Sequence, residues 1–166
     1  MKLRITDDDI TRLAALVGEA CVRRGVDVVT AESCTGGGVA EAITRIAGSS
    51  AWFDRGFVTY ANDAKEAVLG VAHATLAAHG AVSEEVVREM ATGALSHCNA
   101  RLSVAVTGIA GPGGAVPGKP VGLVWFGWAV RDGEAQSRVF HLAGDRERIR
   151  RQSVAIALQG LIDLMR

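Results

Sequence analysis

The chain has 166 residues, a length that fits one domain better than two. Hydrophobic residues make up 49% of it and charged residues 22%, a composition that argues against intrinsic disorder. The 18 basic and 18 acidic side chains cancel, which disfavours nucleic acid as a partner because nucleic-acid binders carry a basic surplus. No segment approaches the roughly 18 apolar residues of a membrane span, and no signal peptide is expected. The three cysteines lack metal-ligand spacing, so we expect a cytoplasmic protein that does not associate with membranes.

The spacing of apolar residues predicts helices that alternate with strands along the first half of the chain. Acidic residues 7–9 favour a helix start, and the apolar stripe after them predicts a helix that ends at Gly25. The later elements expected are, in chain order, a strand at 26–31, a helix from 39 to Gly48, a strand at 56–60, a short helix from Asn62 to about Gly70, a helical segment at 74–78, a helix that starts at Ser83, strands at 102–107, 121–130 and 137–141, and a C-terminal helix that begins at Asp145.

The order of these elements predicts the fold class. Helices and strands that alternate favour a parallel or mixed sheet with helices on both faces. Residues 131–133 form a hairpin signal, so the last two strands are expected to pair antiparallel. We therefore expect a single α/β domain over residues 1–166, with three α/β/α layers and a mixed, mainly parallel sheet.

Two glycine-rich turns follow predicted strands. Glu32-Ser-Cys-Thr-Gly-Gly37 leads into a helix, and the backbone N–H groups at a helix N-terminus can bind a phosphate or carboxylate. Thr107-Gly-Ile-Ala-Gly-Pro-Gly-Gly114 lets the backbone pass close to a ligand. Because open α/β sheets bind ligands beyond the carboxyl ends of their strands, the two turns predict a small-molecule site. A capped tight turn and a surface loop remain the simpler alternatives.

Candidate catalytic groups are few. The four histidines are scattered away from the glycine-rich turns, so neither a Ser-His-Asp site nor a metal site is supported. Lys65 is one of only three lysines, and a useful base needs a pKa about three units below roughly 10.4. The helix dipole supplies only a few tenths, so burial or a second cation has to supply the rest; an exposed helix lysine is the alternative. The candidate hydroxyls are Ser33, Thr35, Ser49, Ser50 and Tyr60, and the pattern does not choose among them. The basic run at 146–151 is typical of a solvated helix face.

Several motifs, taken in order, carry a resemblance to a known family. They are Thr30-Ala-Glu-Ser-Cys-Thr-Gly-Gly37, Gly48-Ser-Ser-Ala-Trp-Phe53, Arg55-Gly-Phe-Val-Thr-Tyr60, Gly80-Ala-Val-Ser83, Thr107-Gly-Ile-Ala-Gly-Pro112, Lys119-Pro-Val-Gly122 and Gly144-Asp-Arg146. With these motifs the sequence resembles the CinA C-terminal family, the nicotinamide-nucleotide amidase group. We find no counterpart of the family's common N-terminal molybdopterin-binding-like domain, so the chain resembles the stand-alone form.

The resemblance implies hydrolysis of the carboxamide of nicotinamide mononucleotide to nicotinate mononucleotide and ammonia, a reaction of NAD salvage. The family site is a serine–lysine arrangement with a helper tyrosine. Carried onto this sequence, it implies Ser50 as the nucleophile, Lys65 as the base and Tyr60 as the assisting hydroxyl. The residues expected to bind the substrate, with Arg146 on its phosphate, are Ser33, Thr35, Gly36, Gly37, Thr107, Gly108 and Arg146.

No metal or organic cofactor is expected, because a Ser-Lys acyl-enzyme mechanism requires neither. Backbone N–H groups at one of the glycine-rich turns are expected to stabilise the oxyanion, although the sequence does not say which turn. If Ser50 is not the nucleophile, Ser33 or Thr35 is the next candidate. A homodimer or higher homo-oligomer is the family-level expectation. The alternative to an enzyme is a non-catalytic nucleotide-binding or regulatory module associated with competence or DNA damage.

Overall fold

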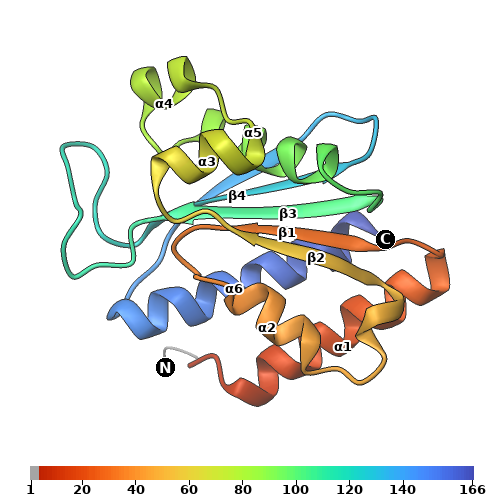
Figure 1. Cartoon of the computed structure of the whole chain (residues 1–166). Helices are drawn as coiled ribbons and strands as arrows, with labels where there is room; N and C mark the ends of the chain where they lie inside the picture. Colours follow the sequence, from red (N-terminus) through yellow and green to blue (C-terminus); the bar gives the residue numbers. More distant parts are fainter. Residues whose placement is uncertain (1–3) are drawn as a thin grey trace.

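The computed structural model describes residues 4–166, and Figure 1 shows a sheet between two layers of helices. The elements, in chain order, are α1 (Asp7–Arg24), β1 (Val28–Glu32), α2 (Gly38–Thr44), the short 3₁₀ helix η1 (Ser49–Ala51), β2 (Phe53–Val58), α3 (Asn62–Leu69), α4 (His73–His79), α5 (Glu84–Ser96), β3 (Leu102–Gly108), β4 (Leu123–Val130), β5 (Gln136–His141) and α6 (Arg146–Leu164). The strand order is β2-β1-β3-β4-β5. β1 pairs parallel with β2 and β3, whereas β4 pairs antiparallel with β3 and β5. The expected mixed, mainly parallel α/β/α fold is confirmed.

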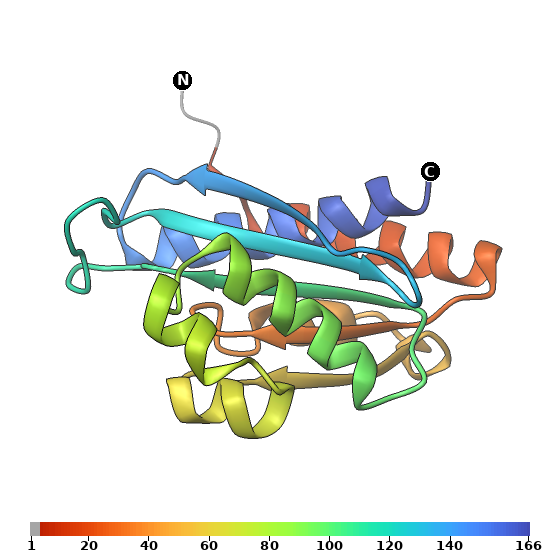
Figure 2. The same ribbon diagram turned by 90° about the horizontal axis from the view of Figure 1, so that it is seen from above.

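The sheet separates two cores. Helices α1, α2 and α6 cover one face, and α3, α4 and α5 cover the other (Figure 1, Figure 2). Successive side chains of a strand point to opposite faces, so each strand contributes to both cores. Phe126 of β4 packs with Val17 and Leu158 on the α6 side, while Val29 of β1 packs with Met90 on the α5 side. β1 and β3 are buried on both faces, and most of their side chains are apolar.

The two longest helices begin at the residues that the sequence predicts. At the start of α1, the Asp9 N–H donates to the Thr6 hydroxyl at 3.1 Å and the Thr6 N–H donates to the Asp9 carboxylate at 2.9 Å. Gly25 ends this helix in the left-handed conformation, as predicted. Asp145 caps α6 by accepting the Arg148 N–H at 2.9 Å. These local contacts satisfy amides that a helix terminus leaves unpaired.

Helix α2 ends at Thr44 rather than at Gly48, and strand β2 also differs from its prediction. The strand runs from Phe53 to Val58 rather than over 56–60, because exposed Asp54 and Arg55 belong to it. Charged residues are common on edge strands, and they hide such a strand from a search for apolar runs. The helix after β2 begins at Asn62, as predicted, and Lys65 lies at its fourth position.

Helix α3 packs closely against α5 at Gly93. A Cβ added to Gly93 of α5 would lie 1.9 Å from the Leu69 carbonyl oxygen. Leu69 is buried and is the last residue of α3. The missing side chain at position 93 therefore allows α3, which carries Lys65, to pack close to α5.

We predict that Gly93→Ala lowers the free energy of unfolding by about 1–3 kcal/mol, the usual cost of overpacking. In an exposed helix the same change would raise the free energy of unfolding by about 1 kcal/mol. A decrease would therefore indicate that the alanine side chain at position 93 collides with α3. Urea denaturation measures the free energy of unfolding, with Gly113→Ala as the control because a Cβ there meets nothing within 4 Å. Stability equal to or above that of the wild type would show that α3 moves away at no cost.

Candidate active site

Polar side chains gather at the edge of the sheet where β1, β2 and β3 end. Ser33 follows β1, Thr59 follows β2, and Thr107 lies at the end of β3. The three strands are parallel, so their carboxyl ends share one edge, the usual ligand-binding edge of an α/β sheet. The Thr59 N–H donates to the Glu32 carbonyl at 2.9 Å, and the Ser33 N–H donates to the Val106 carbonyl at 2.9 Å. These bonds hold the three chain segments together beyond the ladder of the sheet.

Lys65 reaches this edge from α3 and is buried, with 1% of its surface exposed. Its Nζ donates to the Thr59 carbonyl at 2.7 Å and to the Tyr60 carbonyl at 3.3 Å, and it lies 3.0 Å from the Ser33 Oγ. No carboxylate of the described residues pairs with this amine. Burial therefore lowers the pKa of Lys65 below its ordinary 10.5, because removal from water disfavours the charged form.

The partners of Lys65 can accommodate a neutral amine as well as a charged one. Carbonyl oxygens can only accept, so the Thr59 and Tyr60 carbonyls take two N–H groups of the amine. The ammonium form donates its third N–H to the Ser33 Oγ across the 3.0 Å contact, whereas the neutral form presents its lone pair to the Ser33 O–H there. Burial raises the pKa of the neighbouring Cys34 thiol to about 11, so this group stays uncharged near neutral pH and supplies no counter-charge. The alternative interpretation of Lys65 as an exposed helix lysine is wrong.

The first glycine-rich turn is closed by a side chain of the protein. Glu32 is completely buried, and its carboxylate accepts the Val39 N–H at 2.8 Å and the Ala40 N–H at 3.1 Å. These amides lie at the start of α2, where the sequence predicted an anion site. The amides of Val39 and Ala40 are therefore not available to a ligand anion, because the Glu32 carboxylate already accepts from both. Gly36 and Gly37, both with positive φ, allow the chain to turn between β1 and α2.

Ser50 lies at the opposite edge of the sheet. It is exposed in η1, which precedes β2, and the Trp52 carbonyl beside it accepts the N–H of Val28 at the start of β1. Lys65 contacts residues that follow β2. A strand of 6 residues lies between the two positions, and at about 3.3 Å per residue it separates them by about 20 Å. The structure therefore does not bring Ser50 together with Lys65, and Ser33 occupies the position beside the amine.

Tyr60 and Arg146 contact each other beside the site. Tyr60 is 57% exposed, and its hydroxyl accepts a hydrogen bond from the Arg146 Nη2 at 2.9 Å. The Nη1 of the same guanidinium donates to the Gly111 carbonyl at 2.8 Å. Arg146, the first residue of α6, thus joins the segments that follow β2 and β3. The Tyr60 hydroxyl makes no hydrogen bond with Lys65 or Ser33; the residue contacts Lys65 through its backbone carbonyl.

The other predicted substrate-binding residues lie at the same edge, with different roles in the fold. The Thr107 hydroxyl is buried and donates to the Ala81 carbonyl at 2.9 Å. Gly108 packs against β4, where an added Cβ would lie 3.0 Å from the Leu123 carbonyl oxygen. Thr35 is buried as well, but its Oγ1 has no hydrogen-bond partner within residues 4–166. Thr35 therefore keeps an uncommitted hydroxyl close to Ser33.

Sequence reasoning missed Arg150. Its Nε donates to the Cys34 carbonyl at 3.1 Å, and its Nη2 donates to the Thr35 carbonyl at 3.2 Å. Arg150 lies one helical turn after Arg146, so both project from the same face of α6 toward the site. This i, i+4 spacing inside the basic run at 146–151 was an available signal, but a basic run is more often a solvated face.

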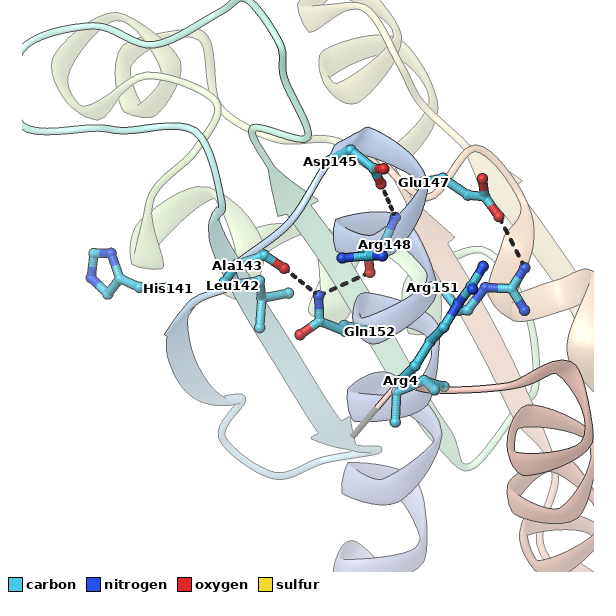
Figure 3. A pocket seen from close by; sticks show the side chains of 10 residues that line it. Arg4, His141, Leu142, Ala143, Asp145, Glu147, Arg148, Arg151 and Gln152 are labelled. Carbon is cyan, nitrogen blue, oxygen red and sulfur yellow. Dashed lines mark hydrogen bonds and ion pairs between the residues drawn. The ribbon is translucent and has the colours of Figure 1, made fainter. Parts of the chain in front are cut away.

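A separate hollow lies beside the start of α6 (Figure 3). It has a volume of about 490 Å³ and is lined by Arg4, Ile5, His141, Leu142, Ala143, Asp145, Glu147, Arg148, Arg151 and Gln152. Of its basic side chains, Arg151 already pairs with Asp7 at 2.7 Å and with Glu147 at 3.3 Å. Neither Ser33 nor Lys65 lines this hollow, so it is distinct from the site at the strand ends.

Comparison with known proteins shows to which family the chain belongs. The model of the CinA C-terminal domain family matches residues 10–165. The chain belongs to the CinA C-terminal domain family. One CinA-family relative, nicotinamide-nucleotide amidohydrolase PncC of Escherichia coli K12, is 55% identical over 157 residues, which are 95% of each chain. The same enzyme of Pseudomonas putida is 53% identical over 161 residues, 95% of this chain and 98% of that one.

Solved structures of CinA proteins share the fold. The competence/damage inducible protein CihA from Agrobacterium tumefaciens has a TM-score of 0.93 and 47% identity, with 100% of both chains covered. A CinA superfamily protein from Klebsiella pneumoniae has a TM-score of 0.91 and 40% identity, with 94% of this chain and 97% of that chain covered. The resemblance that the sequence motifs indicate is thus confirmed.

The lowered pKa of Lys65 makes the stability of the fold depend on pH. The unfolded chain keeps the Lys65 proton up to its ordinary pKa of 10.5, whereas the folded chain releases it at lower pH. Between the two values the unfolded state binds more protons, so stability rises with pH. Relative to Lys65→Met, we predict that the wild type becomes more stable from neutral pH to about pH 10. Urea denaturation at stepped pH measures this difference, and a flat or falling difference would contradict a lowered pKa.

Proposed function

We propose that this chain is a nicotinamide-nucleotide amidohydrolase, which converts nicotinamide mononucleotide and water into nicotinate mononucleotide and ammonia. In this proposal Ser33 is the nucleophile and Lys65 is the general base, and Ser33 replaces the Ser50 expected from the sequence. The observation that carries the proposal is the 3.0 Å contact between the Ser33 Oγ and the buried Lys65 Nζ. Two relatives whose names state this activity, at 55% and 53% identity, support the choice of substrate.

The first half of the reaction forms an acyl-enzyme. The Ser33 Oγ attacks the carboxamide carbon while its proton passes to the lone pair of neutral Lys65. The tetrahedral intermediate collapses when the C–N bond breaks. The Lys65 ammonium returns the proton to the leaving nitrogen, and ammonia departs. The nicotinoyl group is now an ester of Ser33, and Lys65 is neutral again.

The second half of the reaction regenerates the serine. A water molecule attacks the ester carbon while Lys65 accepts one of its protons. The C–O bond to Ser33 breaks, and the Lys65 ammonium returns the proton to the Ser33 Oγ. Nicotinate mononucleotide leaves. The same amine acts as base and acid in each half, which requires a pKa far enough below 10.5 for both forms to be accessible.

Arg146 is the proposed partner of the substrate phosphate. One Nη1 hydrogen donates to the Gly111 carbonyl, and one Nη2 hydrogen donates to the Tyr60 hydroxyl. A guanidinium has five N–H donors, so others stay available for a charge-assisted bond to phosphate. Tyr60 contacts Lys65 through its carbonyl and Arg146 through its hydroxyl, and it thereby links the base to the phosphate-binding residue. In this proposal Thr35, Gly36, Gly37, Thr107 and Gly108 form the walls of the site.

The alternative is a non-catalytic nucleotide-binding or regulatory module. A binding module has no use for a lysine that is buried without a carboxylate, because desolvation of the amine destabilises the fold. Contact of this amine with a serine hydroxyl favours the enzyme.

The expected homo-oligomer and the expected cytoplasmic location stay predictions. Within residues 4–166, no helix has both the length and the apolar character to cross a bilayer.

We predict that Ser33→Ala and Lys65→Met each lower kcat by about 10³-fold or more, because each removes a group that takes part in bond making. Ser50→Ala is the matched control and keeps activity close to that of the wild type. Release of ammonia from nicotinamide mononucleotide measures all three variants. Turnover that survives in Ser33→Ala but disappears in Ser50→Ala would overturn the assignment. Folded wild type that releases no ammonia above the rate without enzyme would end the proposed function.

The pH dependence of kcat/KM tests the base. The free enzyme is competent only when Lys65 is neutral, so kcat/KM rises with pH through an acid limb and levels off above the pKa of Lys65. Burial places this limb below 10.5. Steady-state assays between about pH 6 and pH 10 are expected to show the loss of one proton. Cys34→Ser is the control and leaves the limb in place, because the Cys34 thiol, with a pKa of about 11, is uncharged over most of this range. A flat profile would argue against Lys65 as the base.

A further inference from the structure

The turn that carries Ser33 is held by α6. The Arg150 Nε donates to the Cys34 carbonyl at 3.1 Å, and the Arg150 Nη2 donates to the Thr35 carbonyl at 3.2 Å. Gly36 leaves room for this contact, since an added Cβ would lie 3.3 Å from the Nη2. Arg150 is partly buried, and it forms no ion pair with a described carboxylate. The two turn carbonyls are thus its hydrogen-bond partners within residues 4–166.

Because the peptide group is planar, the contact between Arg150 and the Cys34 carbonyl also fixes the direction of the Thr35 N–H. The peptide bond between Cys34 and Thr35 is trans, since the cis bond found in the described residues is Gly111–Pro112. In a trans peptide the C=O and N–H groups point in opposite directions. The Cys34 carbonyl points toward Arg150 of α6, so the Thr35 N–H points away from α6. Lys65 approaches from α3, which lies on that other face of the sheet (Figure 1).

The Thr35 N–H is free to bind a ligand. Three amides of the turn are occupied, because those of Ser33, Gly36 and Gly38 donate to the carbonyls of Val106, Ser33 and Thr35, whereas those of Cys34, Thr35 and Gly37 have no acceptor among the described residues. The Thr35 N–H donates to no group of the described residues, although the residue is 1% exposed. The Thr35 Oγ1 also lacks a partner there. Buried donors without a partner are rare in folded proteins, and each one calls for an explanation.

We propose that the Thr35 N–H stabilises the oxyanion that forms when Ser33 attacks the carboxamide, and that Arg150 is the positioning residue that aims this N–H. The inference rests on the proposed function, because it assigns a partner to the oxygen of that same intermediate. A fixed donor is most effective when it needs no reorganisation as the charge develops. Arg150 supplies this rigidity through two carbonyls, and its guanidinium stays on the α6 side of the turn.

Steady-state kinetics of the full chain test the role of Arg150. Loss of a whole oxyanion donor lowers kcat by about 10²–10³-fold, so a donor that is only misdirected in Arg150→Ala is expected to lower kcat by about tenfold or more. KM is expected to stay within about twofold, because the oxyanion is absent from the bound substrate. Arg150→Lys, which retains one donor, recovers part of the loss. The pH at which kcat/KM rises is expected to be the same in Arg150→Ala and in the wild type, because Arg150 acts on the turn and not on Lys65.

Arg151→Ala is the matched control. Arg151 is the next residue of α6, but it pairs with Asp7 and Glu147 and does not contact the turn. Its kcat is expected to equal that of the wild type. Wild-type kcat in Arg150→Ala overturns the inference, and so does a loss that resides only in KM. A shifted acid limb also overturns it, since Arg150 would then act on Lys65 through its charge.

A probe that does not depend on nicotinamide mononucleotide separates the inference from the proposed function. A fluorophosphonate labels an activated serine and places its phosphoryl oxygen where the oxyanion would lie. We expect labelling of Ser33, followed by intact-protein mass spectrometry, to slow by about tenfold in Arg150→Ala. Equal labelling rates in the two proteins overturn the inference, whereas a wild type that is labelled but releases no ammonia overturns the proposed function alone. If circular dichroism shows that Arg150→Ala does not fold, Arg150→Lys and Arg150→Gln undergo both assays with the same criteria.

Discussion

Burial of the Lys65 amine without a carboxylate is the interaction on which the site depends. A salt bridge would keep the amine charged, whereas two carbonyls and a serine hydroxyl accommodate it as a neutral base. The arrangement requires that the segment after β2 presents its carbonyls to α3 and that β1 ends at Ser33. It also requires close packing of α3, which the glycine at position 93 of α5 allows. The reactivity of one side chain thus depends on three separate parts of the fold.

Helix α6 connects the loops that surround this amine. Arg146 contacts the segments that follow β2 and β3, and Arg150 contacts the turn that follows β1. The sheet alone fixes the strand ends, but it leaves the conformation of each loop open. Two arginines one helical turn apart therefore set the relative positions of three loops from a single rigid element. Glu32 completes the first loop from within, by occupying the amides at the start of α2.

The sequence predicted the fold well because apolar periodicity and helix caps are local signals. It missed the extent of β2, since Asp54 and Arg55 interrupt the apolar pattern at the edge of the sheet. Lys65 was found because lysines are scarce in this chain, but its burial depends on contacts between α3 and α5 that no local pattern encodes. The choice between Ser33 and Ser50 depended on which end of β2 lies near the amine. The pattern of hydroxyl residues left this choice open and the family resemblance implied Ser50, whereas the position of Lys65 relative to the strand ends favours Ser33.

The contacts made by α6 also bear on the order in which the site is assembled. Protein synthesis proceeds from the N-terminus, so the ribosome makes Ser33 and Lys65 long before Arg146 and Arg150. A nascent chain that has produced all five strands still lacks the helix that holds their loops. Such a chain contains the nucleophile and the base, but the turn between β1 and α2 has no anchor from α6. Docking of α6 is then the folding event that converts an assembled sheet into an ordered site.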